Sequence, residues 1–232
     1  MLNGSKTFIT NAHIADVFVV MAMTDRAQAS HGISAIIVEK DTPGFRAGKK
    51  ENKLGMRCSP TGELIFTDCR VPAANLIGKQ GEGFIDSLRV LDGGRISIAA
   101  LSVGVAQGAY EASLKYSKQR KQFGRSISEF QAIQNKLADM ATEIDAARLL
   151  TLRAAWMKDS GAGVNKESSM AKLYASEMAE EVCSAAIQIH GGYGYVSDYL
   201  VEKIWRDVRV CQIYEGTSDV QRILIGRGLS AL

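Results

Sequence analysis

Residues 170–189 read MAKLYASEMAEEVCSAAIQI, and this stretch decides the fold class of the chain. Its larger side chains recur at steps of four and three residues, which is the period of one face of an α-helix. The positions are Met170, Tyr174, Met178, Val182, Ala185 and Ile189. Stripes of this kind are core far more often than they are cofactor contacts. This stretch therefore predicts a long helix packed against neighbours.

Two further stripes with the same period precede this stretch. One comprises Ile133, Leu137, Met140, Ile144, Ala147 and Thr151. The other comprises Phe84, Leu88, Leu91, Ile98, Leu101 and Val105. A final short helix is expected from Ser218 to about Leu229. Long helices with short connections predict an antiparallel four-helix bundle over residues 76–232.

Residues 1–75 have a different character, because their apolar runs are short and rich in β-branched side chains. These runs are Phe8–Thr10, Val17–Met21, Ile33–Val38 and Leu64–Thr67. Turn signals separate them at Asn3–Gly4, His31–Gly32 and Pro43–Gly44. We therefore expect an α+β chain in which a partial β-sheet or barrel domain precedes the bundle. The first strand should be an unpaired sheet edge.

Composition excludes several classes of protein. Hydrophobic residues make up 46% and charged residues 23%, as in ordinary soluble domains. A net charge of +3 is too small to imply nucleic acid, and no apolar run approaches the roughly 18 residues of a membrane span. The four cysteines form no C-x-x-C pair, so reduced thiols in an intracellular protein are expected.

A bundle could carry a di-iron site, but such sites need Glu-x-x-His pairs. None of His13, His31 and His190 follows a glutamate by three residues, so we expect no metal.

The segment most informative about chemistry is IYEGTSDVQR at residues 213–222. Ser218 and Gln221 fit a capping box, which predicts a helix start and places Glu215 in the loop before it. Gly216 permits a sharp turn or the close approach of a ligand. Taken alone, Glu215 reads as a carboxylate that complements a helix dipole.

The whole string resembles the catalytic-base segment of the acyl-CoA dehydrogenase family. Other segments match that family in the same order, namely Leu2–Asn11, Lys53–Arg57, Leu91–Ile96, Arg120–Gly124 and Gln188–Tyr195. The resemblance covers essentially the whole chain and is nearest to the short-chain, butyryl-CoA branch. It implies FAD-dependent oxidation of short-chain acyl-CoA thioesters to trans-2-enoyl-CoA.

In this resemblance Glu215 is the base that removes the α-proton of the substrate. Other branches of the family place the base just before the arginine of an Asp-x-x-Arg motif. Here that position is Gly94, which leaves Glu215 as the base that the family pattern offers. Asp92, Arg95 and Gly216 are the implied substrate contacts. Without the family, Asp92 and Arg95 read as a local ion pair on a solvated face.

The resemblance also implies the residues that hold FAD. Those near the flavin ring are Phe8, Ile9 and Thr10, with Phe8 standing where the family usually has tryptophan. Those near the adenosine and pyrophosphate of a neighbouring subunit's FAD are Arg120, Gln122, Phe123, Gln188, Ile189, His190, Gly191 and Gly192. Thr217, Ser218 and Asp219 are expected at a helix N-terminus, where backbone N–H groups bind phosphate.

The family's chain normally opens with a helical domain and the first half of the β domain, which this sequence lacks. We expect a fragment, an alternative product or one part of a split protein. By resemblance its partners are acyl-CoA, an electron-transfer flavoprotein and further copies in a dimer of dimers. The resemblance also implies the cytoplasm as its compartment in a bacterium, or the mitochondrial matrix in a eukaryote.

Two competing functions remain open. The first is a catalytically idle scaffold for oligomerisation or assembly. The second is a nucleic-acid-binding relative, suggested only by the basic run Lys115–Arg125.

Overall fold

The computed structural model describes residues 1–230 and divides the chain into two compact units. Unit 1 comprises Met1–Lys53 and Arg57–Val90. Unit 2 comprises Leu54–Met56 and the chain from Leu91 onward. Among the described residues, no helix is long and apolar enough to cross a membrane.

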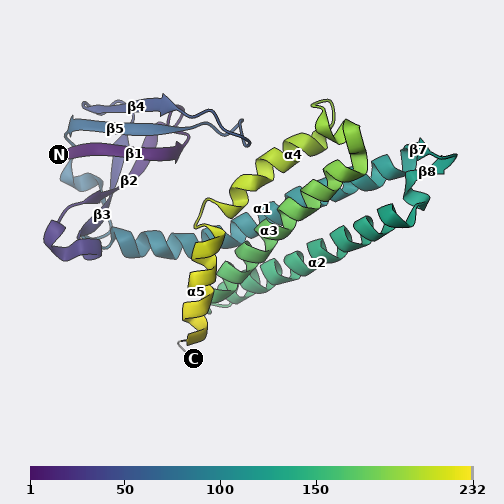
Figure 1. The fold of residues 1–232 in the computed structure, drawn as a ribbon. Coiled ribbons are helices and arrows are strands. Elements are labelled where there is room, and N and C mark those ends of the chain that lie inside the picture. The colour runs from purple at the N-terminus through teal and green to yellow at the C-terminus, as the bar shows by residue number, and fades with distance from the viewer. Residues whose placement is uncertain (231–232) are drawn as a thin grey trace. The chain divides into compact units, whose positions relative to one another are not determined.

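Unit 1 contains two three-stranded antiparallel sheets (Figure 1). The first has the order β1 (Leu2–Thr10), β5 (Thr61–Cys69) and β4 (Phe45–Lys50). The second has the order β2 (Val17–Met23), β3 (Ile33–Glu39) and β6 (Leu76–Ile77). β1 is therefore an edge strand, as the sequence predicts.

Aromatic rings from both sheets form the centre of unit 1. The ring centroids of Phe18 and Phe45 lie 5.1 Å apart, and those of Phe45 and Phe66 lie 5.2 Å apart. The strand β4, which carries Phe45, is absent from the sequence prediction because FRAGKK has neither an apolar run nor β-branched residues.

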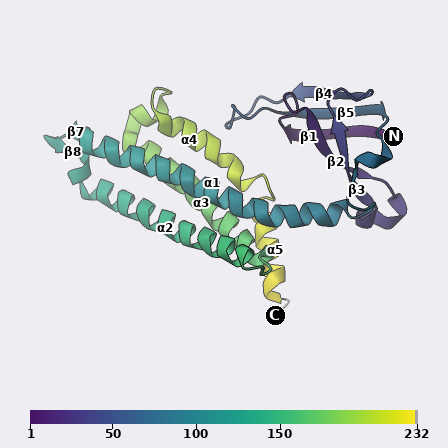
Figure 2. The same ribbon diagram turned by 180° about the vertical axis from the view of Figure 1, so that it is seen from behind.

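Unit 2 is a helical bundle in which α1 to α4 run alternately in opposite directions and α5 crosses them (Figures 1 and 2). They are α1 (Gly83–Gln119, here from Leu91), α2 (Gln131–Asp159), α3 (Asn165–His190), α4 (Leu200–Val208) and α5 (Ser218–Ser230). A small hairpin of β7 (Lys121–Gln122) and β8 (Arg125–Ser126) joins α1 to α2. Small antiparallel sheets followed by a helical bundle confirm the expected α+β class.

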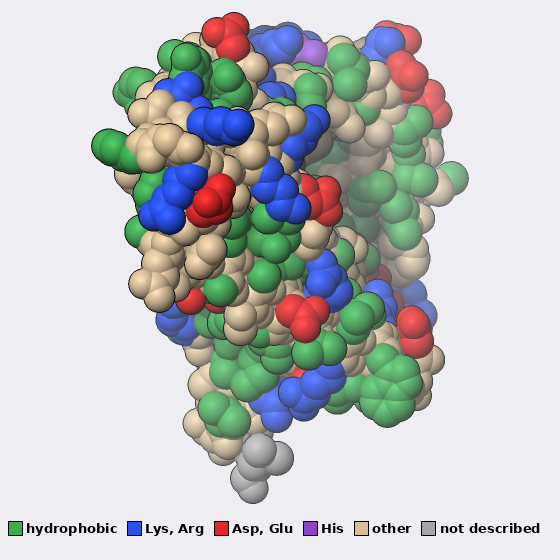
Figure 3. All heavy atoms as spheres, turned by 90° about the vertical axis from the view of Figure 1, so that its right-hand side faces the viewer, with side chains coloured by type: hydrophobic (Ala, Val, Ile, Leu, Met, Phe, Trp, Pro, Cys, Tyr) green, Lys and Arg blue, Asp and Glu red, His purple; other side chains and the backbone are tan. Residues whose placement is uncertain are grey.

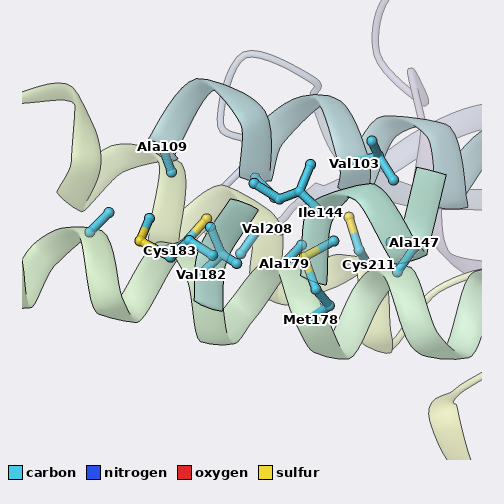
Figure 4. Packing of buried hydrophobic residues seen from close by; sticks show 14 of the residues in the cluster. Val103, Ala109, Ile144, Ala147, Met178, Ala179, Val182, Cys183, Val208 and Cys211 are labelled. Carbon is cyan, nitrogen blue, oxygen red and sulfur yellow. The ribbon is translucent and has the colours of Figure 1, made fainter. Parts of the chain in front are cut away.

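The core of the bundle lies among α1, α2, α3 and α4, and includes Val208 and Cys211 (Figure 4). Ile144 of α2 faces Met178, Ala179 and Val182 of α3, with Val103 of α1 nearby. The expected stripe on α2 is confirmed, since it is buried from Leu137 to Thr151.

The expected stripe on α1 is only partly right: Ile98 and Val105 pack against the core, but three of its larger side chains do not. Phe84, Leu88 and Leu101 are 36%, 40% and 37% exposed. The buried face carries Ala99, Val103, Ala106 and Ala109 instead. Small side chains on this face allow the neighbouring helices to approach closely. The periodicity of large apolar residues does not reveal such a face, because its own side chains are only weakly hydrophobic. On α3, Tyr174 is likewise 39% exposed, whereas Met178, Val182 and Ile189 are buried.

Candidate active site

The segment around Glu215 joins the short 3₁₀ turn Arg209–Gln212 to α5. Glu215 has φ of +54° and Gly216 has φ of +90°, so two successive residues adopt left-handed backbone conformations. A Cβ atom at Gly94 of α1 would collide with Oε2 of the Glu215 carboxylate. The missing side chain at Gly94 therefore makes the space that this carboxylate occupies.

The start of α5 differs from the expected capping box of Ser218 and Gln221. The Val220 N–H donates to Oγ1 of Thr217 at 3.3 Å, so Thr217 is the capping side chain. The Gln221 side chain turns back and donates to the carbonyls of Glu215 (3.2 Å) and Gly216 (2.9 Å). The expectation was wrong because Gln221 satisfies the carbonyls of the preceding loop rather than the cap N–H.

Lys172 of α3 lies beneath the same loop and is fully buried. Its Nζ donates to the Gly216 carbonyl at 2.7 Å. Burial lowers the pKa of Lys172 to about 8, although Cys211 and Glu215 act in the opposite direction. Sequence reasoning missed this residue. The available signal was a lysine on the apolar side of a helix, between Ala171 and Ala175.

Asp92 and Arg95 point the same way, as their spacing suggests, and they bind each other. Arg95 Nη1 donates to Asp92 Oδ1 at 2.7 Å, and Asn165 Nδ2 donates to the same oxygen at 2.9 Å. Arg95 is only 4% exposed whereas the Asp92 side chain is 30% exposed, so the pair reaches from the bundle interior to its surface rather than lying on a solvated face.

Four buried side-chain atoms at this site have no hydrogen-bond partner. They are Arg95 Nε, Glu215 Oε2, Ser218 Oγ and Gln221 Oε1. Within residues 1–230 these are the only buried side-chain nitrogen or oxygen atoms in that condition. Buried polar groups are nearly always paired, so such a concentration is typical of a site that receives a polar ligand.

A hollow of about 810 Å³ lies at the β7–β8 end of the bundle. Its walls are aromatic, because the rings of Tyr116 and His190 stack at 4.3 Å and Tyr199 meets both edge-on. The Arg120 guanidinium lies 5.4 Å from the ring centroid of Tyr193. Burial lowers the pKa of His190, which favours a neutral imidazole. Seen from this end, Lys and Arg side chains lie among hydrophobic ones (Figure 3).

Most of the residues expected to hold the adenosine part of FAD line this hollow together. They are Arg120, Gln122, Phe123, Ile189, His190, Gly191 and Gly192. Gln188 lines a different hollow, beside Glu177, Glu180 and Glu181. Tyr116 and Tyr199 were missed, because neither lies in a motif that the sequence singles out.

The remaining expected residues lie elsewhere. Thr217 and Asp219 are exposed at the start of α5, where Ser218 is partly buried. In unit 1, Phe8 has φ of +57° at a β-bulge between Lys6 and Ile9 and is 72% exposed. The bulge turns this aromatic ring outward beside Thr10, which is also exposed.

Part of the motif Lys53–Arg57, the loop 54–56, is held by hydrogen bonds to α4 within unit 2. The Met56 N–H donates to Oδ1 of Asp207 at 2.6 Å, and Arg206 donates to the Leu54 carbonyl at 3.1 Å. A Cβ at Gly55 would collide with the Arg206 carbonyl. The loop 54–56 is therefore fixed on α4 by two hydrogen bonds between side chains of α4 and the loop backbone, and the close approach requires glycine at position 55.

Comparison with known proteins defines the family of this chain. Residues 81–230 match the acyl-CoA dehydrogenase C-terminal domain, and residues 1–69 match the acyl-CoA dehydrogenase middle domain. The chain belongs to the acyl-CoA dehydrogenase family.

Individual relatives are similar over nearly all of this chain. The short-chain-specific acyl-CoA dehydrogenase of Clostridium acetobutylicum is 49% identical over 97% of the chain and 59% of its own length. The caffeyl-CoA reductase–Etf complex subunit CarC of Acetobacterium woodii is 48% identical over 97% of the chain and 59% of its own length. The structure of butyryl-CoA dehydrogenase from Megasphaera elsdenii superposes with a TM-score of 0.96 at 48% identity, covering 98% of this chain and 60% of that one. The chain thus spans about 60% of the length of these relatives.

Proposed function

We propose that this chain carries the catalytic base and part of the flavin site of an enzyme that oxidises short-chain acyl-CoA thioesters to trans-2-enoyl-CoA. The observation that carries the proposal is the Glu215 carboxylate. It has a buried, unpaired Oε2 and occupies space left by Gly94. A general base must present a free oxygen toward the proton that it removes.

In this proposal Glu215 accepts the proton from the α-carbon of the thioester. Asp92, Arg95 and Gly216 contact the substrate around that carbon. Arg95 Nε and Ser218 Oγ are unpaired donors at the same site, which suits the oxygen atoms of an acyl thioester. The loop backbone is held from two sides, so the carboxylate is aligned before substrate arrives.

The residues present fit FAD as the cofactor. Aromatic rings together with Arg120 and Arg125 suit a flat adenosine joined to an anionic pyrophosphate. The adenosine and pyrophosphate of a neighbouring copy's FAD would be held by Arg120, Gln122, Phe123 and the stretch Gln188–Gly192. Phe8, Ile9 and Thr10 of unit 1, with Thr217–Asp219, would contact the remainder. When bound, FAD supplies the acceptor for the hydride that leaves the β-carbon.

The partners follow from the same proposal. An electron-transfer flavoprotein would be the recipient of the electrons that a bound FAD takes from the substrate. The similarity to an Etf-complex subunit supports this assignment. That relative is a reductase, and Glu215 would serve that direction equally well by returning a proton to the α-carbon.

The test is Glu215→Gln in the FAD-loaded protein. Glutamine keeps the shape of the side chain but is not a base, so acyl-CoA binding should persist. Flavin bleaching by butyryl-CoA should slow by at least about 10³-fold. Glu111→Gln, on the exposed surface of α1, is the matched control and should bleach normally. Normal bleaching in the Glu215 variant would refute the assignment.

A further inference from the structure

Lys172 is a buried charge for which the proposed chemistry has no role. It is fully buried on α3 between Ala171 and Ala175, which are also fully buried. Lysine is rarely buried to this degree unless it is paired. Its hydrogen-bond partner is a backbone carbonyl, that of Gly216, at 2.7 Å.

The Gly216 carbonyl receives a second donor, Nε2 of Gln221 at 2.9 Å. Two side chains from two helices therefore use both lone pairs of one oxygen. That oxygen belongs to the peptide group joining Gly216 to Thr217, one residue beyond Glu215, whose own φ is +54°. Such conformations persist only when the surroundings fix them, and here Lys172 and Gln221 do so.

The charges around Lys172 come from several elements. Cys211 of the 3₁₀ turn, Glu215 of the loop and Glu177 of α3 favour its ammonium form, while Arg95 of α1 opposes it. Burial is the largest influence and lowers the pKa of Lys172 to about 8, so the group is mostly cationic at neutral pH.

We propose that Lys172 is a positioning residue for the base: its buried ammonium fixes the Gly216 carbonyl and thereby aims the Glu215 carboxylate. The inference rests on the proposed role of Glu215. It predicts an effect on the rate of proton removal and little effect on substrate affinity, because Lys172 is fully buried.

The first test compares Lys172→Met with Lys172→Arg in the FAD-loaded protein. Methionine is of similar length but cannot donate, and misplacing a catalytic group costs roughly 10²-fold. The maximum rate of flavin reduction by butyryl-CoA should therefore fall by about tenfold or more, with half-saturation changed by less than about threefold. Arginine should restore the rate to within about threefold. Lys40→Met removes an exposed lysine of unit 1 and should change nothing.

The second test is the pH profile of the wild-type protein, which needs no variant to fold. The reduction rate should decline as pH rises past about 8, because Lys172 then loses its charge. This decline should be absent in Lys172→Met. A flat wild-type profile from pH 7 to 9.5, or a Met variant with the wild-type rate, would overturn the inference.

The third test uses the 232-residue chain without flavin or substrate. In Lys172→Met, amide hydrogen exchange of residues 215–217 should accelerate by about tenfold or more, while α2 keeps its protection. Unchanged exchange in this loop would overturn the inference without touching the role of Glu215. Normal flavin reduction in Glu215→Gln would instead refute the proposed function, and the exchange result would still stand.

Discussion

At the scale of single residues, the substitution Gly94→Ala should change stability and activity in opposite directions. A Cβ at Gly94 collides with the Glu215 carboxylate, so Gly94→Ala must displace the proposed base. Alanine in a helix interior stabilises by roughly 0.5–1 kcal/mol relative to glycine. We expect flavin reduction to fall by about 10²-fold while the melting temperature stays equal or rises.

Gly104→Ala is the matched control, because it lies on the same helix and its Cβ would meet nothing within 4 Å. It should give the same helix stabilisation with no loss of flavin reduction. If Gly94→Ala and Gly104→Ala reduced flavin equally fast, Glu215 would not be confined as the structure indicates.

The sequence alone identified some residues of this site and not others. Glu215 and Gly94 were identified because they lie in motifs with a known order. Lys172 was not, because a lysine in an amphipathic helix reads as part of the solvated face. Gln221 was assigned to a cap because its spacing fits one, yet its amide reaches the Glu215 and Gly216 carbonyls. Spacing cannot distinguish a side chain that turns back from one that caps.

At the scale of elements, Asp207 should make the contact between loop 54–56 and α4 sensitive to acid. Its burial alone would raise its pKa, but Lys203, the Met56 N–H and Arg206 together lower the pKa of Asp207 below its ordinary value. As pH falls, the Asp207 carboxylate is therefore protonated in the unfolded chain before it is protonated in the folded chain. The stabilisation is complete above about pH 4 and is lost progressively below it.

Asp207→Ala should therefore lower the free energy of unfolding at pH 7 by roughly 1–3 kcal/mol, because the Met56 N–H loses its acceptor. The difference from wild type should shrink below pH 4, which chemical denaturation across pH would measure. Asp145→Ala removes an exposed partner of Arg148 and should cost less than about 1 kcal/mol at either pH. Equal losses in both variants would contradict the role given to Asp207.

Elements with strong periodicity were predicted best. The stripe on α2 and the start of α5 at Ser218 agree with the structure. On α1 the buried face consists mostly of alanines and serines, so several of the largest side chains indicated the wrong side. Hydrophobic periodicity detects a core made by large residues and overlooks one made by close backbone approach.

At the scale of the whole molecule, the change of period near residue 80 was enough to predict the α+β class. Seven of the residues that line the hollow at the β7–β8 end were expected to share a site, because they lie in two recognisable motifs. Its aromatic wall was not predicted, because Tyr116, His190 and Tyr199 come from three separate segments and are brought together only by folding.

The helix α2 has a second apolar face, which is exposed and bears on how copies of the chain assemble. Leu149, Leu152 and Trp156 follow at steps of three and four residues and are 62%, 58% and 69% exposed. They lie on a different side of the helix from the buried Ala147, Thr151 and Ala154. A row of large exposed apolar side chains is typical of an interface, and burying each one contributes roughly 1.5–3 kcal/mol. We therefore expect copies of this chain to associate through this face.

Sedimentation velocity with Leu152→Glu and Trp156→Glu combined tests this expectation. Two carboxylates in the interface should weaken association by at least about 10²-fold. A loss of about 2.7 kcal/mol of association free energy suffices for that change. Ile14→Glu introduces the same charge at a 63% exposed position outside the helices and should leave the assembly intact. Because the proposed FAD site draws residues from a neighbouring copy, the double variant should also hold FAD less tightly. An unchanged sedimentation coefficient would assign the interface to another surface.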